Sequence, residues 1–349
     1  MNTGSKKSRK KEEEPIGFLP DFDASSILSS AEELIGEGRD RQAVALLMNA
    51  VKASPGNTQL MDAAAQLLID VGAVEQAAQI LKRSTELDKG TDGLKWMLLG
   101  QIHQAEDSVN FYQQGIDVMI TRHKLLQESK DQSDLPVLAL QISNGYCSMA
   151  ELYTTDLCDE DNAESECDRL INLAVTCCPT NSDAHQALAN LRLLQKRRSD
   201  AVASLDECLR LILPEEDAEM NGTSDEKEEL EEHSGSYDHR LTVAKLCVEL
   251  GRHEAGIRLV ERLLVEDDSI IELWYVTGLL YMGDGQAEWA VQYLSRAQAM
   301  LEKMPDAELS ARVAESLHKA QSLRGESERI DSEEDEAPKP DEEEEDMAD

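Results

Sequence analysis

A pattern that returns every 34 residues constrains the fold of this 349-residue chain more than any other feature. Gly38 and Gly72 stand 34 positions apart, and Gly251 and Gly285 repeat the interval much later in the chain. A repeat of this length forms one supersecondary unit, which buries its apolar face only by stacking on its neighbours. Because aromatic residues make up only 4% of the chain, helices are favoured over strands as the elements of that unit. We therefore expect a stacked array of helix pairs.

Within each period the sequence resembles the tetratricopeptide repeat, in which a glycine turn joins two antiparallel helices. That repeat places large apolar and small residues at fixed positions, and the unit that starts at Ile271 fits this pattern best. Its matching residues are Trp274, Gly278, Tyr281, Ala290, Leu294 and Ala297. Four further regular units start at Ala24, Thr58, Ser182 and Tyr237.

Two units in the middle of the array are irregular. In the third unit Tyr112 comes about four residues early, which predicts a short turn between its helices. The fourth unit carries about five extra residues within the segment 156–164. The predicted fold is all-α: a tetratricopeptide-repeat superhelix of about seven helix pairs, with a C-terminal closing helix from Asp306 to Ser322.

The acidic residues are concentrated outside the repeats. The chain has a net charge of −37, and residues 326–349 contain 14 acids and 2 bases. Residues 215–232 contain 10 acids and 1 base. Because blocks of like charge repel each other and stay solvated, we predict an acidic tail over 324–349 and an insertion over 215–235, both disordered. The solenoid is expected over 24–323, after a basic, irregular segment over 1–23. The acidic segments either serve only solvation or shield a basic client.

Several classes of function have no support in the sequence. A strongly acidic body disfavours nucleic-acid binding, and no apolar run approaches the roughly 18 residues of a membrane span. Nucleotide-binding loops and hydrolase motifs are missing, and no histidines and cysteines stand at metal-ligand spacing. Seven cysteines without a CxxC pair indicate reduced, mostly buried thiols in an intracellular protein. We expect a non-enzyme without cofactor or metal.

The repeat pattern also predicts which side chains line the concave groove of the array. They are mostly acids and amides, and they lack the Lys, Arg and Asn set that clamps the acidic tails of heat-shock chaperones. Such a groove suits an extended peptide rich in Lys and Arg, although its acids could also be merely solvated. The predicted binding residues are Glu32, Asp62, Gln66, Asp70, Gln101, Asn144, Glu151, Thr154, Asp156, Asp159, Asp183, Asn190, Glu249, Glu272 and Tyr275.

Two segments carry a more specific resemblance. The run Ala-Glu-Leu-Tyr-Thr-Thr-Asp-Leu-Cys-Asp-Glu at 150–160 and the run Glu-Leu-Trp-Tyr-Val-Thr-Gly at 272–278 resemble stretches of the fungal dedicated assembly chaperones of large-subunit ribosomal protein uL-four. The resemblance covers Ala24 to about Arg324. It implies that the chain captures a newly made ribosomal protein by its long basic internal loop. It also implies that the pair enters the nucleus and that the client is released on the pre-60S particle.

A different class of function remains open at this point. The array could be a scaffold that bridges folded partners in a larger complex, as other tetratricopeptide proteins are. Lys6, Lys7, Arg9, Lys10 and Lys11 form a basic cluster of the nuclear-import type. With the implied client, this cluster predicts a protein of the cytoplasm and nucleus, and we expect a monomer.

Overall fold

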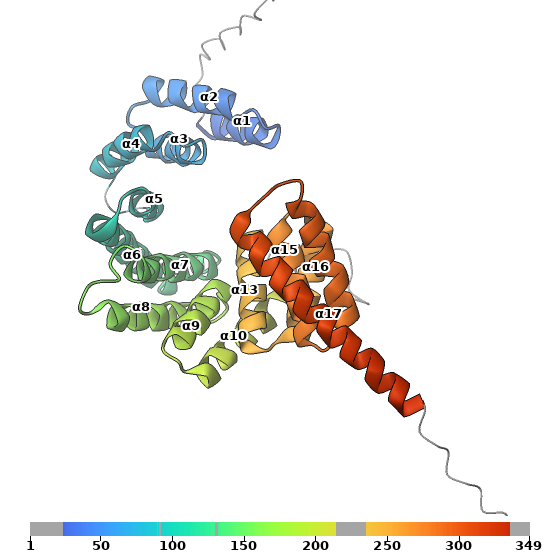
Figure 1. Cartoon of the computed structure of the whole chain (residues 1–349). Coiled ribbons are helices and arrows are strands. Elements are labelled where there is room, and N and C mark those ends of the chain that lie inside the picture. The colour runs from blue at the N-terminus through green and yellow to red at the C-terminus, as the bar shows by residue number, and fades with distance from the viewer. Residues whose placement is uncertain (1–23, 89, 91, 130–131, 214–234, 336–349) are drawn as a thin grey trace, which may run out of the picture. The chain divides into compact units, whose positions relative to one another are not determined.

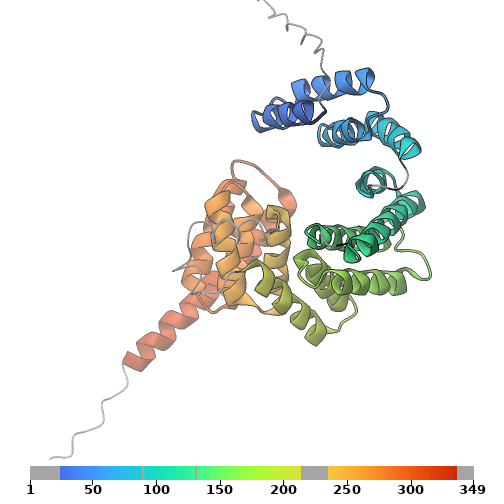
Figure 2. The ribbon, with the colours of Figure 1, turned by 180° about the vertical axis from the view of Figure 1, so that it is seen from behind.

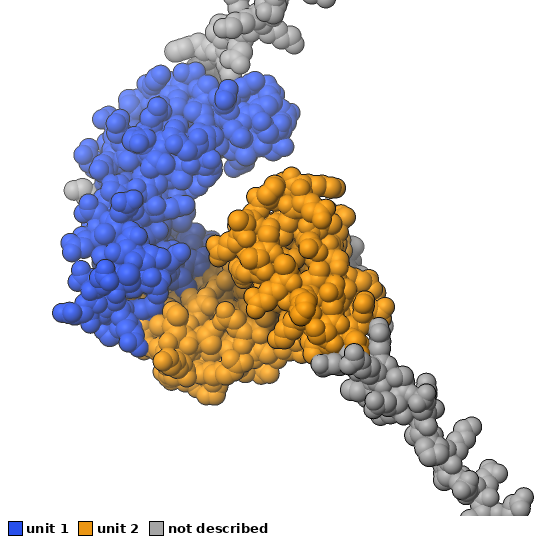
Figure 3. Space-filling view, viewed as in Figure 1, with its two compact units in different colours: residues 1–167 blue, residues 168–349 orange. Residues whose placement is uncertain are grey.

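A computed structural model describes residues 24–335, except 89, 91, 130–131 and 214–234. All regular secondary structure in these residues is helical, which confirms the predicted all-α fold (Figure 1). The chain divides into two compact units, residues 1–167 and 168–349 (Figure 3). No helix within the described residues is long and apolar enough to cross a membrane.

The helices of the first unit follow one another in antiparallel pairs, each packed against the next (Figures 1 and 2). Their bounds are α1 (Ala24–Gly36), α2 (Asp40–Ala53), α3 (Thr58–Asp70), α4 (Val74–Leu87), α5 (Leu94–Ile102), α6 (Ala105–Gln127), α7 (Leu135–Thr154) and the start of α8 (Ala163–Cys177). The second unit continues the pattern with α9 (Ser182–Leu194), α10 (Arg198–Ile212), α13 (Tyr237–Leu250), α14 (His253–Glu266), α15 (Ile271–Gly283), α16 (Ala287–Leu301) and α17 (Ala307–Asp335).

The predicted repeat boundaries agree with the helix boundaries. Each of the five regular units was expected to start at a residue that begins the first helix of a pair, namely α1, α3, α9, α13 and α15. Along the described chain there are seven pairs, and α17 follows them. The expected array of seven pairs with a closing helix is therefore confirmed.

The expected glycine turns have a conformational cause. Gly38, Gly72, Gly251 and Gly285 have φ between 69° and 82°, a region that glycine enters without the steric cost of a Cβ. The fifth repeat differs, because Lys196 occupies the equivalent position with φ 61°.

The small residues of the pattern are required by close helix packing. Ala43, Ala77, Ala201 and Ala290 hold the same place in four second helices and have no exposed surface. A Cβ added to Gly278 would lie 2.5 Å from Cγ of Leu294, so only glycine lets α15 approach α16 this closely. These positions build the core of each pair.

The closing helix is longer than expected. Asp306 caps it as predicted, since its Oδ1 accepts a hydrogen bond of 2.9 Å from the Leu309 amide. The helix then continues past Ser322 to Asp335, because each further residue adds a hydrogen bond once the helix has started. Residues 324–335, where the sequence analysis placed the start of the disordered tail, are thus part of this helix. Residues 1–23 and 336–349, and nearly all of the insertion at 215–235, lie outside the described residues.

The two irregular units have the predicted irregularities. Helix α5 has only nine residues, and two residues separate it from α6, which starts at Ala105 with φ 49°. After α7, residues 155–162 form a run of turns before α8 begins. Both departures from the repeat lie beside a pocket of the first compact unit.

Candidate functional site

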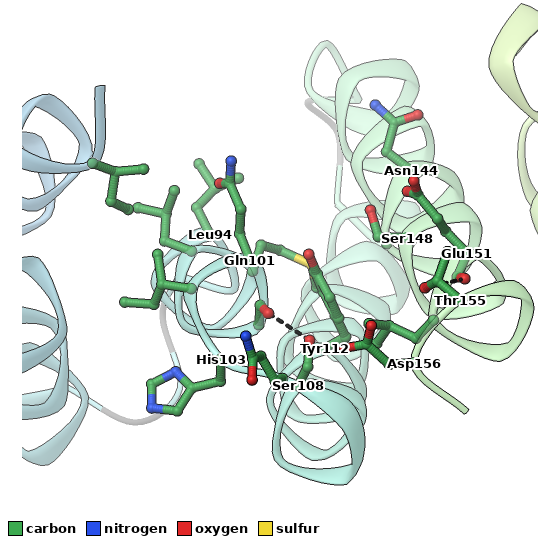
Figure 4. A pocket seen from close by; sticks show the side chains of 18 of the residues that line it. Leu94, Gln101, His103, Ser108, Tyr112, Asn144, Ser148, Glu151, Thr155 and Asp156 are labelled. Atoms are coloured by element: carbon green, nitrogen blue, oxygen red, sulfur yellow. Dashed lines mark hydrogen bonds between the residues drawn. The ribbon is translucent and has the colours of Figure 1, made fainter. Parts of the chain in front are cut away.

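A pocket of about 920 Å³ lies within the first unit, between α5, α6, α7 and the turn that follows α7 (Figure 4). Apolar side chains, including Met97, Leu98, Ile102 and Leu152, form part of its wall. The polar part consists of amides, hydroxyls, one imidazole and two carboxylates: Gln101, Gln104, Gln141, Asn144, Ser108, Tyr112, Ser148, Thr155, His103, Glu151 and Asp156. The pocket therefore offers an apolar surface next to negative charge.

The two carboxylates give the pocket its electrostatic character. Glu151 lies near the end of α7 and Asp156 in the following turn, and both are exposed. None of the residues lining the pocket is Lys or Arg. Within the described part of the chain, neither carboxylate forms a salt bridge. A cationic ligand would therefore find two carboxylates that no Lys or Arg side chain of the pocket neutralises.

Local hydrogen bonds hold the acidic edge of the pocket in place. The hydroxyls of Thr154 and Thr155 both donate to the Glu151 carbonyl oxygen, at 2.8 and 3.0 Å, where α7 ends. Asp156 Oδ2 accepts a hydrogen bond of 3.3 Å from the Ala105 amide, the first residue of α6. Because a helix N-terminus carries partial positive charge, this contact also stabilises the carboxylate.

Tyr112 forms the inner wall of the pocket and is only 8% exposed. A Cβ added at Gly100 would lie 2.8 Å from its ring, so the glycine makes room for the ring. Burial raises the pKa of Tyr112, and the charge of Glu151 raises it further, while a hydrogen bond with Ser148 lowers it. The phenol therefore stays protonated at neutral pH and can act as a hydrogen-bond donor.

Four of the fifteen predicted binding residues line this pocket: Gln101, Asn144, Glu151 and Asp156. Asn144, Ser148 and Glu151 follow one another along α7, and Gln101 lies across from them on α5 (Figure 4). The predicted residues Glu32, Gln66, Asp70, Thr154 and Asp159 are exposed elsewhere in the same unit, and the Gln66 amide donates to Asp70 at 3.1 Å.

Asp62 has a different environment from the open groove that was expected. Its side chain is 18% exposed, accepts a hydrogen bond of 2.6 Å from Ser84, and lies 3.6 Å from the ammonium of Lys95. Lys95 is fully buried and also lies 3.2 Å from Asp88. Burial raises the pKa of Asp62, and the contacts with Ser84 and Lys95 lower it. Asp62 therefore pairs with a buried lysine where the second and third helix pairs meet, and it also lines a second pocket of about 720 Å³.

The predicted residues of the second unit are mostly engaged within that unit. Asp183 Oδ1 lies 2.6 Å from His239 Nδ1, and Glu272 forms a salt bridge of 2.9 Å with Lys245. Asn190 is half-buried, and Glu249 is exposed while its carbonyl oxygen accepts a hydrogen bond from Arg198.

Tyr275 was expected to face the groove, but the structure corrects this placement. The side chain is only 6% exposed, and Arg312 of the closing helix α17 lies 5.1 Å from its ring centroid. The repeat pattern alone cannot account for this, because α17 is not part of a repeat. Tyr275 therefore stabilises the end of the array and is not open to a ligand.

The sequence analysis did not identify Tyr112 and Ser148 as part of the site. The early position of Tyr112 in its repeat predicted a short turn between the helices. It did not predict that the Tyr112 ring would line a pocket. Within the described residues, no group of three or more His, Cys, Asp or Glu side chains could hold a metal ion.

No family model matches the chain. A Schizosaccharomyces pombe protein named "Probable assembly chaperone of rpl4" is 26% identical over 259 residues, which are 73% of this chain and 72% of that protein. An Emericella nidulans protein of the same name is 25% identical over 272 residues, covering 73% of this chain and 64% of that protein. The solved structure "Assembly Chaperone of RpL4 (Acl4)" matches 76% of this chain and 98% of its own, with a TM-score of 0.61 and 23% identity. The resemblance inferred from the sequence and the tetratricopeptide-repeat fold are both confirmed.

Proposed function

We propose that this tetratricopeptide-repeat protein, which resembles the assembly chaperones of rpl4, is itself a dedicated chaperone of a newly made uL-four-type ribosomal protein. It binds the basic extended loop of that client, protects the loop and escorts the client to the pre-60S particle in the nucleus. The observation that carries the proposal is the acidic pocket of the first compact unit, which has two carboxylates and no Lys or Arg among its lining residues. The names of the two curated relatives support the choice of client.

The chemistry of the pocket suits an extended basic segment. The aliphatic stem of a Lys or Arg side chain packs on the apolar wall, while Glu151 and Asp156 receive its charge. The amides of Gln101 and Asn144 are placed to bond the peptide backbone. A loop of this kind is unfolded without its binding partner, so covering it prevents aggregation.

The first unit carries most of the proposed binding. In the second unit Asp183 and Glu272 already contact His239 and Lys245, so a ligand would have to displace these side chains first. Glu151 and Asp156 require no such displacement. We therefore assign the cationic part of the client to the pocket of the first unit.

Calorimetric titration of the full-length protein with two forms of a uL-four protein tests this function. The account predicts stoichiometric binding of the intact ribosomal protein and of a synthetic peptide of its internal loop. Deletion of the loop from the ribosomal protein should abolish binding. If the loop-deleted form binds as tightly as the intact form, recognition does not occur through the loop.

A further inference from the structure

An aromatic cluster in the seventh helix pair has no part in the proposed function. The rings of Tyr281 and Tyr293 are stacked, with centroids 5.1 Å apart and planes 7° from parallel. Trp274 and Trp289 lie 5.7 and 6.5 Å from Tyr293, so Tyr293 is the centre of a cluster of four rings, of which Tyr281 is buried. The chain has only three tryptophans, and two of them are in this cluster.

Packing of α15 on α16 explains only part of this surface. That packing uses Leu273, Leu280, Ala290 and Leu294, which have no exposed surface. Trp289 is 49% exposed, so the packing of the two helices leaves about half of this side chain in contact with water. Half-exposed tryptophans beside other aromatic rings are typical of residues that dominate the energetics of protein interfaces.

One ring of the cluster, and one aromatic ring outside it, already contact an arginine side chain. The guanidinium of Arg296 lies 5.5 Å from the Trp274 ring centroid, and that of Arg312 lies 5.1 Å from the ring centroid of Tyr275. Among the described residues, no cation lies over Trp289. The exposed carboxylate of Glu261 lies at the edge of the cluster, where it accepts a hydrogen bond of 2.7 Å from the Tyr281 hydroxyl. The cluster thus joins an open aromatic face with a nearby negative charge.

We propose that the surface formed by Trp274, Trp289 and Tyr293, which lies on the buried ring of Tyr281, is a second binding surface, which takes an arginine side chain of an extended basic segment. The guanidinium stacks on Trp289 and the Glu261 carboxylate stabilises its charge. A chain with a net charge of −37 repels nucleic acids and second copies of itself, so a basic peptide is the favoured occupant.

Nuclear magnetic resonance of the tryptophan indole N–H groups tests this surface in the full-length protein. The probes are capped Gly-Arg and Gly-Lys repeat peptides of equal length, titrated near physiological ionic strength. The Trp289 signal is assigned by its loss in Trp289→Phe, and Trp96→Phe assigns the tryptophan of the first unit. We expect the arginine peptide to shift the Trp289 signal at lower concentration than the lysine peptide.

The variant Trp289→Ala should weaken binding of the arginine peptide, read at the Trp274 signal, by about two- to fivefold. Because Trp289 is half exposed, the variant should fold, and circular dichroism checks this. Reversal of the pocket charges at Glu151 and Asp156 should leave the Trp289 shift unchanged, which separates this surface from the pocket. Equal response to both peptides, or an unmoved Trp289 signal at saturation, would overturn the proposal. So would displacement of the arginine peptide by an uncharged apolar peptide.

Discussion

At the scale of single residues, Lys196 is the exception among the turns of the five regular repeats. It holds φ 61° where Gly38, Gly72, Gly251 and Gly285 stand in other units. A residue with a Cβ in this conformation costs roughly 1–2 kcal/mol of stability. Glycine avoids this cost, but it gives back part of the gain because its unfolded chain has more conformational entropy. Lys196→Gly should therefore raise the free energy of unfolding by about 0.5–1 kcal/mol, measured by urea unfolding. The matched control Gly251→Ala should lower it, and a less stable Lys196→Gly protein would contradict this explanation.

The cysteines should differ sharply in reactivity. Burial raises the pKa of the Cys208 thiol and raises that of Cys247 to about 12. Cys158, in the turn after α7, is exposed. Because the thiolate is the reactive form, iodoacetamide at mildly alkaline pH should label Cys158 in the native protein and spare Cys208 and Cys247. Mass spectrometry reads the labelled sites, and native labelling of Cys247 as fast as Cys158 would show that the second unit opens readily.

At the scale of helices, a salt bridge between α13 and α14 should make stability sensitive to acid. Hydrogen bonding from Arg240 lowers the pKa of Glu266 below its usual value. Because the pKa of Glu266 is lower in the folded than in the unfolded protein, its ionised form stabilises the fold at pH values above its pKa in the unfolded chain. This stabilisation is lost as the pH falls through its pKa in the folded protein. Glu266→Gln should cost about 0.5–1 kcal/mol at neutral pH, since the carboxylate is half exposed, and should flatten the loss of stability below about pH 4.5. Parallel pH profiles for both proteins would argue against this contribution.

Only the first half of the closing helix α17 should contribute to the stability of the fold. Val313, Leu317 and Ala320 are buried against the preceding pair, and Arg312 covers Tyr275. Truncation after Gly325 keeps these contacts, so we expect the melting temperature to change by less than about 5 °C. Truncation after Asp306 exposes this apolar face and should lower the melting temperature by more. Equal losses for the two truncations would show that residues beyond Gly325 also stabilise the array.

At the scale of the whole molecule, the sequence predicts the repeats well because each unit must satisfy the same packing. The alanines at the helix crossings and the turn glycines are dictated by contacts within a unit, so a 34-residue window contains the necessary information. The site was harder to predict because its features come from departures from the repeat. Tyr112 enters the pocket through a short turn, Asp62 partners a buried lysine of the next unit, and Arg312 of α17 covers Tyr275.

The central claim is that the acidic pocket of the first unit binds the basic loop of a uL-four-type client. It is tested most directly by the affinity of the double variant Glu151→Lys, Asp156→Lys for the loop peptide. Each reversal should cost about 1–3 kcal/mol, because attraction becomes repulsion on a partly desolvated surface. The control variant Glu75→Lys, Glu86→Lys makes the same charge change at exposed positions of α4 outside the pocket and should bind nearly as well as the wild type. A folded pocket variant that binds as tightly as this control would contradict the account.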